Sequence, residues 1–100
     1  MIIAITRFSL PHGTDLDQLR ARFYASAPLF EDVPGLVRKH FLIAESGRTA
    51  GGVYVWDDRE SASAFLMSVL APLIFEKFGV EPTIEYFESP LVVENLVPAL

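Results

Sequence analysis

The sequence contains no cysteine and only two histidines, His12 and His40. Without thiols the chain can form no disulfide, no cysteine-ligated metal site and no thiolate nucleophile. The two histidines are far apart and match no metal-binding spacing such as H-x-x-x-H. We therefore expect the protein to use neither a metal nor a cofactor.

Positive charge is also scarce. Eight Lys and Arg stand against thirteen Asp and Glu, and the basic residues are scattered, so nucleic acid is not an expected partner. No basic n-region with a cleavage signal opens the sequence. The longest apolar run, 62–75, is shorter than a membrane span and contains Ser63, Ser68 and Pro72. We expect a cytoplasmic protein that binds no membrane.

Apolar residues, by contrast, are abundant. They make up 51% of the chain, and the mean hydropathy is +0.34. One hundred residues form a single domain with little interior. The surplus of apolar side chains therefore predicts burial against a second copy of the chain or around a ligand.

Four strands are predicted from β-branched and alternating apolar residues. They cover residues 2–10, 36–45, 50–56 and 82–88. Ser46-Gly47 supplies the turn between the middle two strands.

Two helical segments are predicted between the strands. The first begins with Thr14 as N-cap and ends or kinks at Pro28. The second begins at the capping pair Asp57 and Glu60, and Pro72 should kink it or start a second short helix.

The resulting order β-α-β-β-α-β is typical of the ferredoxin-like α+β fold, an antiparallel sheet with helices on one face. We assign residues 1–89 to this domain. The apolar tail 90–100 is expected to dock on a partner subunit, or else to fold back over its own sheet edge.

Both faces of the predicted hairpin are apolar. One face carries Val37, Lys39, Phe41, Ile43, Gly52, Tyr54 and Trp56, and the other carries Leu36, Arg38, His40, Leu42, Gly51, Val53 and Val55. Either face could border the helices. Since both need cover, we predict a homodimer whose sheets pack together with the helices outside, burying on the order of 1,600 Å².

Several motifs resemble those of the YdhR-like monooxygenases, part of the dimeric α+β barrel superfamily that includes antibiotic-biosynthesis and quinol monooxygenases. These motifs are Pro34-Gly35, Lys39, the run 50–54 and the capped helix with Ser61, Ala62 and Ala64. The close match covers residues 33–66. The resemblance implies a homodimeric barrel with a pocket between the helices and the sheet of each subunit.

Three residues are candidates for catalysis. His40 could act as a base toward a phenol, because imidazole titrates near neutral pH, or could be a hydrogen-bonded histidine at the dimer interface. Tyr54 and Trp56 share a strand face with Phe41, and these rings could line an aromatic pocket or form ordinary core.

The candidate ligand-binding residues for a small hydrophobic or aromatic ligand are Phe23, Tyr24, Phe41, Gly51, Gly52 and Phe65. The glycine pair allows close approach of a ligand or of another backbone, or forms a β-bulge. Arg38, Lys39 and Arg48 form the one local positive group, which could attract an anion or be a solvated edge with ion pairs between subunits.

Two functions from different classes follow. The first is a cofactor-independent monooxygenase that deprotonates a small aromatic or polyketide-like substrate, which then donates an electron to O₂. The alternative is a noncatalytic small-molecule-binding or stress-associated dimeric protein. Haem degradation, as in related dimeric barrels, is a third reading, but it needs a well-placed histidine.

Overall fold

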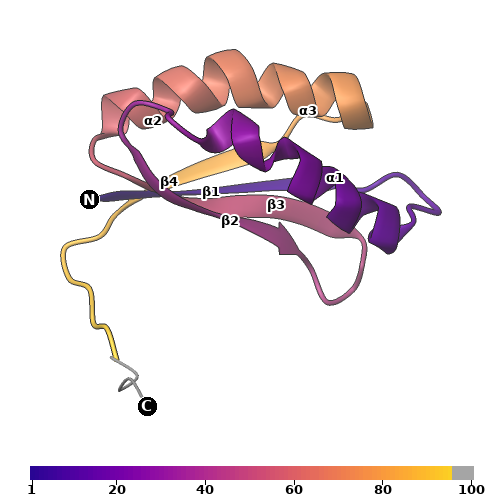
Figure 1. Cartoon of the computed structure of the whole chain (residues 1–100), viewed down its shortest axis with the longest axis horizontal. Coiled ribbons are helices and arrows are strands. Elements are labelled where there is room, and N and C mark those ends of the chain that lie inside the picture. The colour runs from indigo at the N-terminus through magenta and orange to yellow at the C-terminus, as the bar shows by residue number, and fades with distance from the viewer. Residues whose placement is uncertain (96–100) are drawn as a thin grey trace.

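Residues 1–95 are described by a computed structural model, which has one four-stranded sheet (Figure 1). The strands are β1 (Ile2–Ser9), β2 (Leu36–Ile43), β3 (Thr49–Trp56) and β4 (Thr83–Glu88). All neighbours pair antiparallel in the order β2-β3-β1-β4. The ferredoxin-like α+β fold is thus confirmed.

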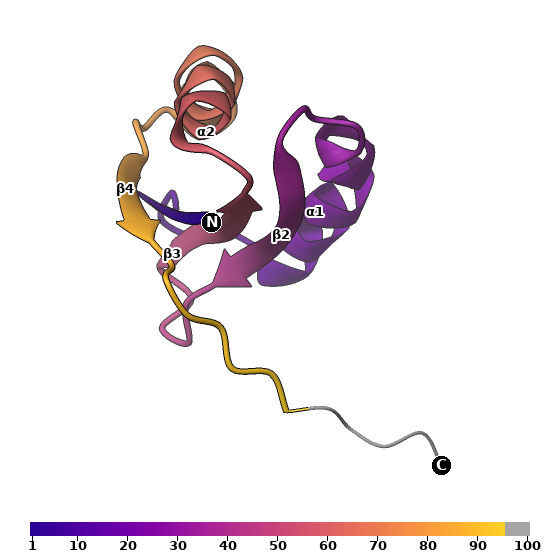
Figure 2. The same cartoon turned by 90° about the vertical axis from the view of Figure 1, so that its left-hand side faces the viewer.

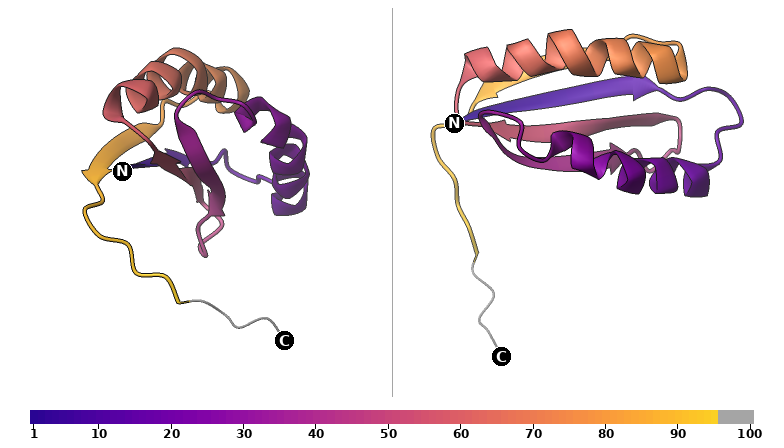
Figure 3. Two further views of the ribbon diagram at one scale, coloured as in Figure 1. Left: turned by 60° about the vertical axis from the view of Figure 1, so that its left-hand side comes forward. Right: turned by 45° about the horizontal axis from the view of Figure 1, so that its top comes forward.

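Helix α1 (Leu16–Phe30) precedes the hairpin, and a continuous helical rod follows it. The rod consists of α2 (Arg59–Phe65), a π-helical turn η1 (Leu66–Leu70) and α3 (Ala71–Phe78). It runs along the length of the sheet, apart from α1 (Figure 3). Leu19 of α1 and Leu66 of the rod are both buried in one core with Tyr54 of β3. Both helical segments therefore cover the same face of the sheet, which we call the covered face.

The rod is long and apolar enough, by length and composition alone, to cross a membrane. Its residues Ala62, Leu66, Leu70 and Ile74 recur every four positions and are buried against the rest of the domain. Such a stripe is typical of a helix that packs on a core.

In both helical segments the N-cap is the residue directly after the predicted one. The carboxylate of Asp15, not Thr14, caps α1, accepting hydrogen bonds from the backbone N–H groups of Asp17 and Gln18 at 2.9 and 3.2 Å. The hydroxyl of Thr14 instead donates to the Pro11 carbonyl. Asp58, not Asp57, caps the rod and accepts from the Ser61 N–H at 2.7 Å. The same bonds from Ser61 lower the pKa of the Asp58 carboxyl.

The two helical prolines act differently. Pro28 does not end α1, which runs on to Phe30. Pro72 lies in the first turn of α3, directly after the π turn, in which the Ala71 N–H reaches back to the Leu66 carbonyl. The widened turn accommodates the missing N–H of the proline without breaking the rod.

The hairpin pairs Ile43 with Ala50, a register centred on Ser46-Gly47. From Arg38 onward, the residues of β2 lie on the faces that the sequence predicts. Before Arg38, a bulge between Leu36 and Arg38 shifts the strand by one residue. Leu36 therefore packs against the core and Val37 is exposed, the reverse of the prediction.

No helix within residues 1–95 lies over the opposite face of the sheet, which we call the uncovered face. Ile5 and Val53 pair at its centre, next to His40 on β2. Leu42 and Phe87 are large apolar residues that stay exposed. This face is therefore apolar and open in the single chain.

The segment after β4 leaves the domain and extends away from the sheet (Figure 2). Leu91, Val92 and Val93 are all exposed. The rest of the predicted docking tail, 96–100, lies outside the described residues, so docking on a partner stays a prediction.

Candidate functional site

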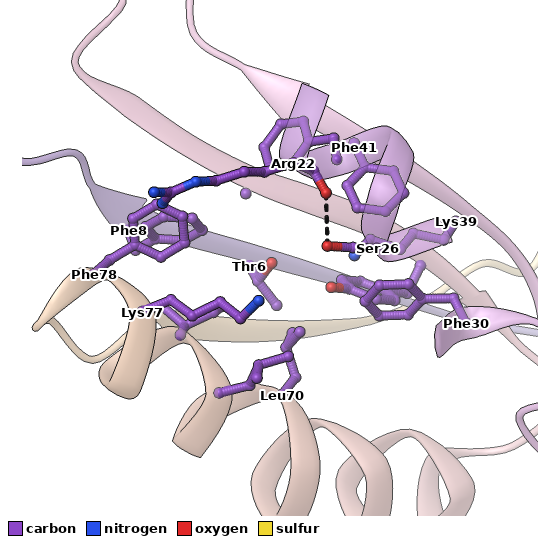
Figure 4. A pocket seen from close by; sticks show the side chains of 15 residues that line it. Thr6, Phe8, Arg22, Ser26, Phe30, Lys39, Phe41, Leu70, Lys77 and Phe78 are labelled. Carbon is purple, nitrogen blue, oxygen red and sulfur yellow. Dashed lines mark hydrogen bonds between the residues drawn. The ribbon is translucent and has the colours of Figure 1, made fainter. Parts of the chain in front are cut away.

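A cavity lies between the helices and the covered face of the sheet (Figure 4). Its volume is about 60 Å³, which is room for a few water molecules at most. Side chains of α1, the rod and three strands line it: Thr6, Phe8, Arg22, Phe23, Ser26, Phe30, Lys39, Phe41, Gly51, Tyr54, Leu70, Leu73, Ile74, Lys77 and Phe78.

Lys39 is the central polar group of this cavity. Its Nζ lies 3.3 Å from the ring centroid of Phe30, 3.8 Å from that of Phe41 and 4.8 Å from that of Tyr54. We call these three rings the aromatic cage. They come from α1, β2 and β3, so the tertiary fold assembles the cage. Their faces attract an ammonium group by cation–π interaction.

The aromatic cage offers Lys39 no negative charge. None of the residues that line the cavity is Asp or Glu, and within residues 1–95 the ion pair present joins Arg20 to Asp17. Burial without a counter-ion disfavours the charged amine and lowers the pKa of Lys39 from 10.5 to about 7. A substantial fraction of Lys39 is therefore a neutral amine, a competent base, near pH 7.

The glycine pair of β3 explains how a lysine fits there. A Cβ on Gly52 would lie 3.2 Å from Cε of Lys39 and 3.0 Å from Cε1 of Tyr54. Gly52 thus leaves the space that the Lys39 side chain occupies. At Gly51 a Cβ would lie 1.9 Å from the Thr6 carbonyl oxygen, so β1 approaches closely there. β3 pairs with β1 in continuous register through both glycines, so close approach, not a bulge, accounts for the pair.

Two hydroxyl groups accompany Lys39. Burial raises the pKa of Tyr54, so its phenol stays protonated and can donate a hydrogen bond. Thr6 is 1% exposed, and a hydrogen bond between its side chain and Tyr54 acts to lower the pKa of the phenol against the larger effect of burial. The two hydroxyl groups thus lie together on the cavity wall.

Four of the predicted site residues line the cavity, namely Tyr54, Phe23, Phe41 and Gly51. His40 does not reach it, because it points to the uncovered face, where it is exposed. Trp56 is 0% exposed and lies in the core, stacked on Tyr54 with ring centroids 6.2 Å apart.

The remaining predicted ligand-binding residues lie around the cavity without lining it. Gly52 lies beneath Lys39, as described above. Phe65 packs in the core between Phe30 and Trp56. Tyr24 is 84% exposed and borders a more open groove of about 500 Å³, which shares Phe23 with the cavity.

Sequence reasoning missed the residues that give the cavity its chemistry. Lys39 was grouped with a charged edge, although it alternates with Phe41 and Ile43 on an apolar face and pairs with Tyr54 across the hairpin. Phe30 was missed because the helix was expected to end or kink at Pro28. Arg22, Lys77 and Thr6 carry no local signal, since the fold brings them together from separate elements.

Comparison with known proteins agrees with this architecture. The profile of the family described as "Putative mono-oxygenase ydhR" matches residues 6–88. A search of curated protein sequences gave no match.

Solved structures similar to this chain share its fold at low sequence identity. A protein of unknown function from Nitrosomonas europaea has a TM-score of 0.73 at 16% identity, covering 96% of this chain and 95% of its own. The heme-degrader MhuD from Mycobacterium tuberculosis, with two hemes bound in its active site, has a TM-score of 0.70 at 22% sequence identity. The match covers 94% of this chain and 100% of MhuD. A mutant of SnoaB, a cofactor-independent oxygenase from Streptomyces nogalater, has a TM-score of 0.65 at 18% sequence identity. The match covers 94% of this chain and 97% of SnoaB.

Proposed function

Because the chain belongs to the ydhR family of mono-oxygenases, we propose that it catalyses cofactor-independent monooxygenation of a small aromatic or polyketide-like substrate. The observation that carries this proposal is Lys39, an amine with a pKa of about 7 inside an aromatic cavity. Such a group can remove a proton from a phenol or an enol at neutral pH.

The proposed reaction starts with transfer of that proton to the neutral amine of Lys39. The electron-rich anion then gives one electron to O₂, and the two radicals combine to form a C–O bond. The peroxide anion takes the proton back from Lys39, which regenerates the neutral amine. For a substrate CH₂ group, the hydroperoxide then loses water and leaves a carbonyl. One oxygen atom ends in the product and the other in water, so substrate electrons reduce the O₂.

Other residues of the cavity would stabilise the charges that form during this reaction. The ammonium of Lys39 that forms on proton transfer faces the rings of Phe30 and Phe41, which attract it. The Tyr54 hydroxyl can donate a hydrogen bond to the substrate oxygen where negative charge develops. The apolar walls exclude water, which strengthens both interactions.

Oxygen uptake with anthrone-type compounds and quinols tests the proposal. We expect the wild type to consume O₂ and the variant Lys39→Met to lose at least about 100-fold in turnover, the usual contribution of a general base. His40→Ala, one residue along β2, is the matched control and should change turnover less than about twofold. Equal turnover in wild type and Lys39→Met would contradict the assignment.

The alternative of a noncatalytic binding protein rests on the same cavity. It predicts that aromatic compounds raise the melting temperature without any O₂ uptake. Measuring both quantities on one preparation separates the two functions.

Haem degradation, the activity named for MhuD, fits this chain less well. No histidine, cysteine or methionine is among the residues that line the cavity. A Soret band that shifts on titration with haem, and that the variant Lys39→Met loses, would revive this function.

We also propose that the chain acts as a homodimer joined through the uncovered face. Ile5, Val53, Leu42 and Phe87 form an apolar surface there, and such a surface is rarely left open in a monomer. Light scattering should give a dimer for the wild type. Val53→Glu should give a monomer, whereas Val69→Glu, on the exposed side of the rod, should remain a dimer; a monomeric wild type would contradict the proposal.

A further inference from the structure

The charges that line the cavity are all of one sign. Arg22 comes from α1, Lys39 from β2 and Lys77 from α3, and no carboxylate is among the lining residues. This is unexpected in a chain with thirteen acidic and eight basic residues. Three elements thus direct cationic side chains to one apolar space.

The three cations reach the cavity at different places. In Figure 4 the guanidinium of Arg22 lies beside Phe8, while Lys39 lies at the other end beside Phe30. The side chain of Lys77 directs its amine between them, toward Thr6. A flat molecule can therefore meet Lys39 with one group and the other two cations with another.

Neither Arg22 nor Lys77 forms an ion pair with any residue of 1–95. Both also border a neighbouring hollow that contains one carboxylate, that of Asp15. Oδ1 of that carboxylate caps α1 by accepting from the backbone N–H groups of Asp17 and Gln18, and the carboxylate forms no ion pair with either cation. The two cations are free to bind an anion.

Two neutral hydroxyl groups lie between the cations. Thr6 is 1% exposed, and its side chain forms a hydrogen bond with Tyr54 that acts to lower the pKa of that phenol against the larger effect of burial. These hydroxyls add no negative charge, so the anion that the cations can bind must come from a ligand.

We propose that the substrate is an aromatic acid whose carboxylate binds Arg22 and Lys77 while its ionisable hydroxyl or enol faces Lys39. This inference rests on the proposed function and adds the class of substrate to it. Guanidinium and ammonium groups are the standard partners of a carboxylate, and the ring faces of the cavity hold the aromatic part. Because the cavity is only about 60 Å³, the exposed side chains of Arg22 and Lys77 move outward on binding.

Calorimetry with a matched pair of probes tests the substrate class. 6-Hydroxy-2-naphthoate carries a hydroxyl and a carboxylate at opposite ends of its ring system, and 6-hydroxy-2-naphthamide replaces the carboxylate with a neutral group of similar shape. We expect wild type to bind the acid at least about tenfold more tightly than the amide, and Arg22→Gln and Lys77→Gln each to remove most of that preference. Arg48→Gln, in the β2–β3 loop, is the control with the same charge change and should keep the preference.

Any of three results would overturn the inference. They are equal affinity of the wild type for acid and amide, no detectable binding of the acid at roughly 1 mM, or a loss of the preference for the acid in Arg48→Gln as large as in the other two variants. All the substituted side chains are exposed, so folding should be retained, and a thermal melt of each variant checks this. Failure of the proposed function looks different. In that case O₂ uptake is absent or independent of Lys39, while the preference for the acid persists in Lys39→Met.

Discussion

Lys39 and His40 are neighbours on β2, yet they lie on opposite faces of the sheet. Lys39 is held in the aromatic cage on the covered face, and His40 is exposed on the uncovered face. Because side chains alternate along a strand, one step in the sequence decides which group meets the cavity. The environment of a side chain, more than the usual pKa of its residue type, therefore decides whether it can act as a base at neutral pH. The lysine, not the histidine, is placed and tuned as a base for neutral pH.

The pH dependence of turnover should separate the two residues most strongly. Since Lys39 must be neutral to accept a proton, kcat/KM should rise nearly tenfold per pH unit below pH 7 and then level off, which is about 50-fold between pH 5 and pH 7. His40→Gln should keep this profile. A profile that flattens in His40→Gln would place the base on the uncovered face instead.

Stability should show the cost of holding Lys39 in the cage. The unfolded chain binds a proton on this lysine up to about pH 10.5, and the folded chain only up to about pH 7. Wild-type stability therefore rises with pH between these values, and the full cost of the buried charge is present below pH 7. Lys39→Met should be more stable than wild type at pH 6, on the order of 1–3 kcal/mol, and the gain should shrink toward pH 10.

Urea unfolding at pH 6 and pH 9 measures this difference. His40→Met, on the exposed side of the same strand, should stay within about 0.5 kcal/mol of wild type at both values. A variant Lys39→Met that is less stable than wild type at pH 6 would show that the lysine is not desolvated as described.

The smallest change in turnover is expected from a substitution that fills the space beneath the aromatic cage. Gly52→Ala puts a methyl group 3.2 Å from Cε of Lys39, so the amine must shift within the aromatic cage. We expect turnover to fall about tenfold while the protein stays folded. Gly51→Ala is the contrasting variant, because its Cβ meets the backbone of β1 and should prevent normal folding. Unchanged turnover in Gly52→Ala would mean that the position of Lys39 is not critical.

The fold was predictable from the sequence because each element carries its own pattern. Alternating apolar residues placed the strands, and their order with two helical segments fixed the ferredoxin-like class. The same alternation put Lys39, Phe41 and Tyr54 on one face. It could not say that the helices cover that face, because both faces of the hairpin are apolar.

The site was predictable only in part, and Phe30 shows why. The proline rule put the end or a kink of α1 at Pro28, but tertiary packing carries the helix to Phe30 and sets that ring 3.3 Å from the Lys39 amine. The bulge at Leu36 is a similar case, since one extra residue reverses the face without any mark in the pattern. Long-range assembly, not local propensity, creates the cage.

The most direct test of this account is the titration of Lys39 itself. The chain contains two lysines, Lys39 and Lys77, so NMR of protein labelled with ¹³C-lysine should give two Cε resonances, and Lys77→Arg assigns them. Because Lys39 is buried in the aromatic cage without a counter-ion, its resonance should titrate with a pKa of about 7. A Lys39 resonance that titrates near the ordinary lysine value of 10.5 would contradict this account.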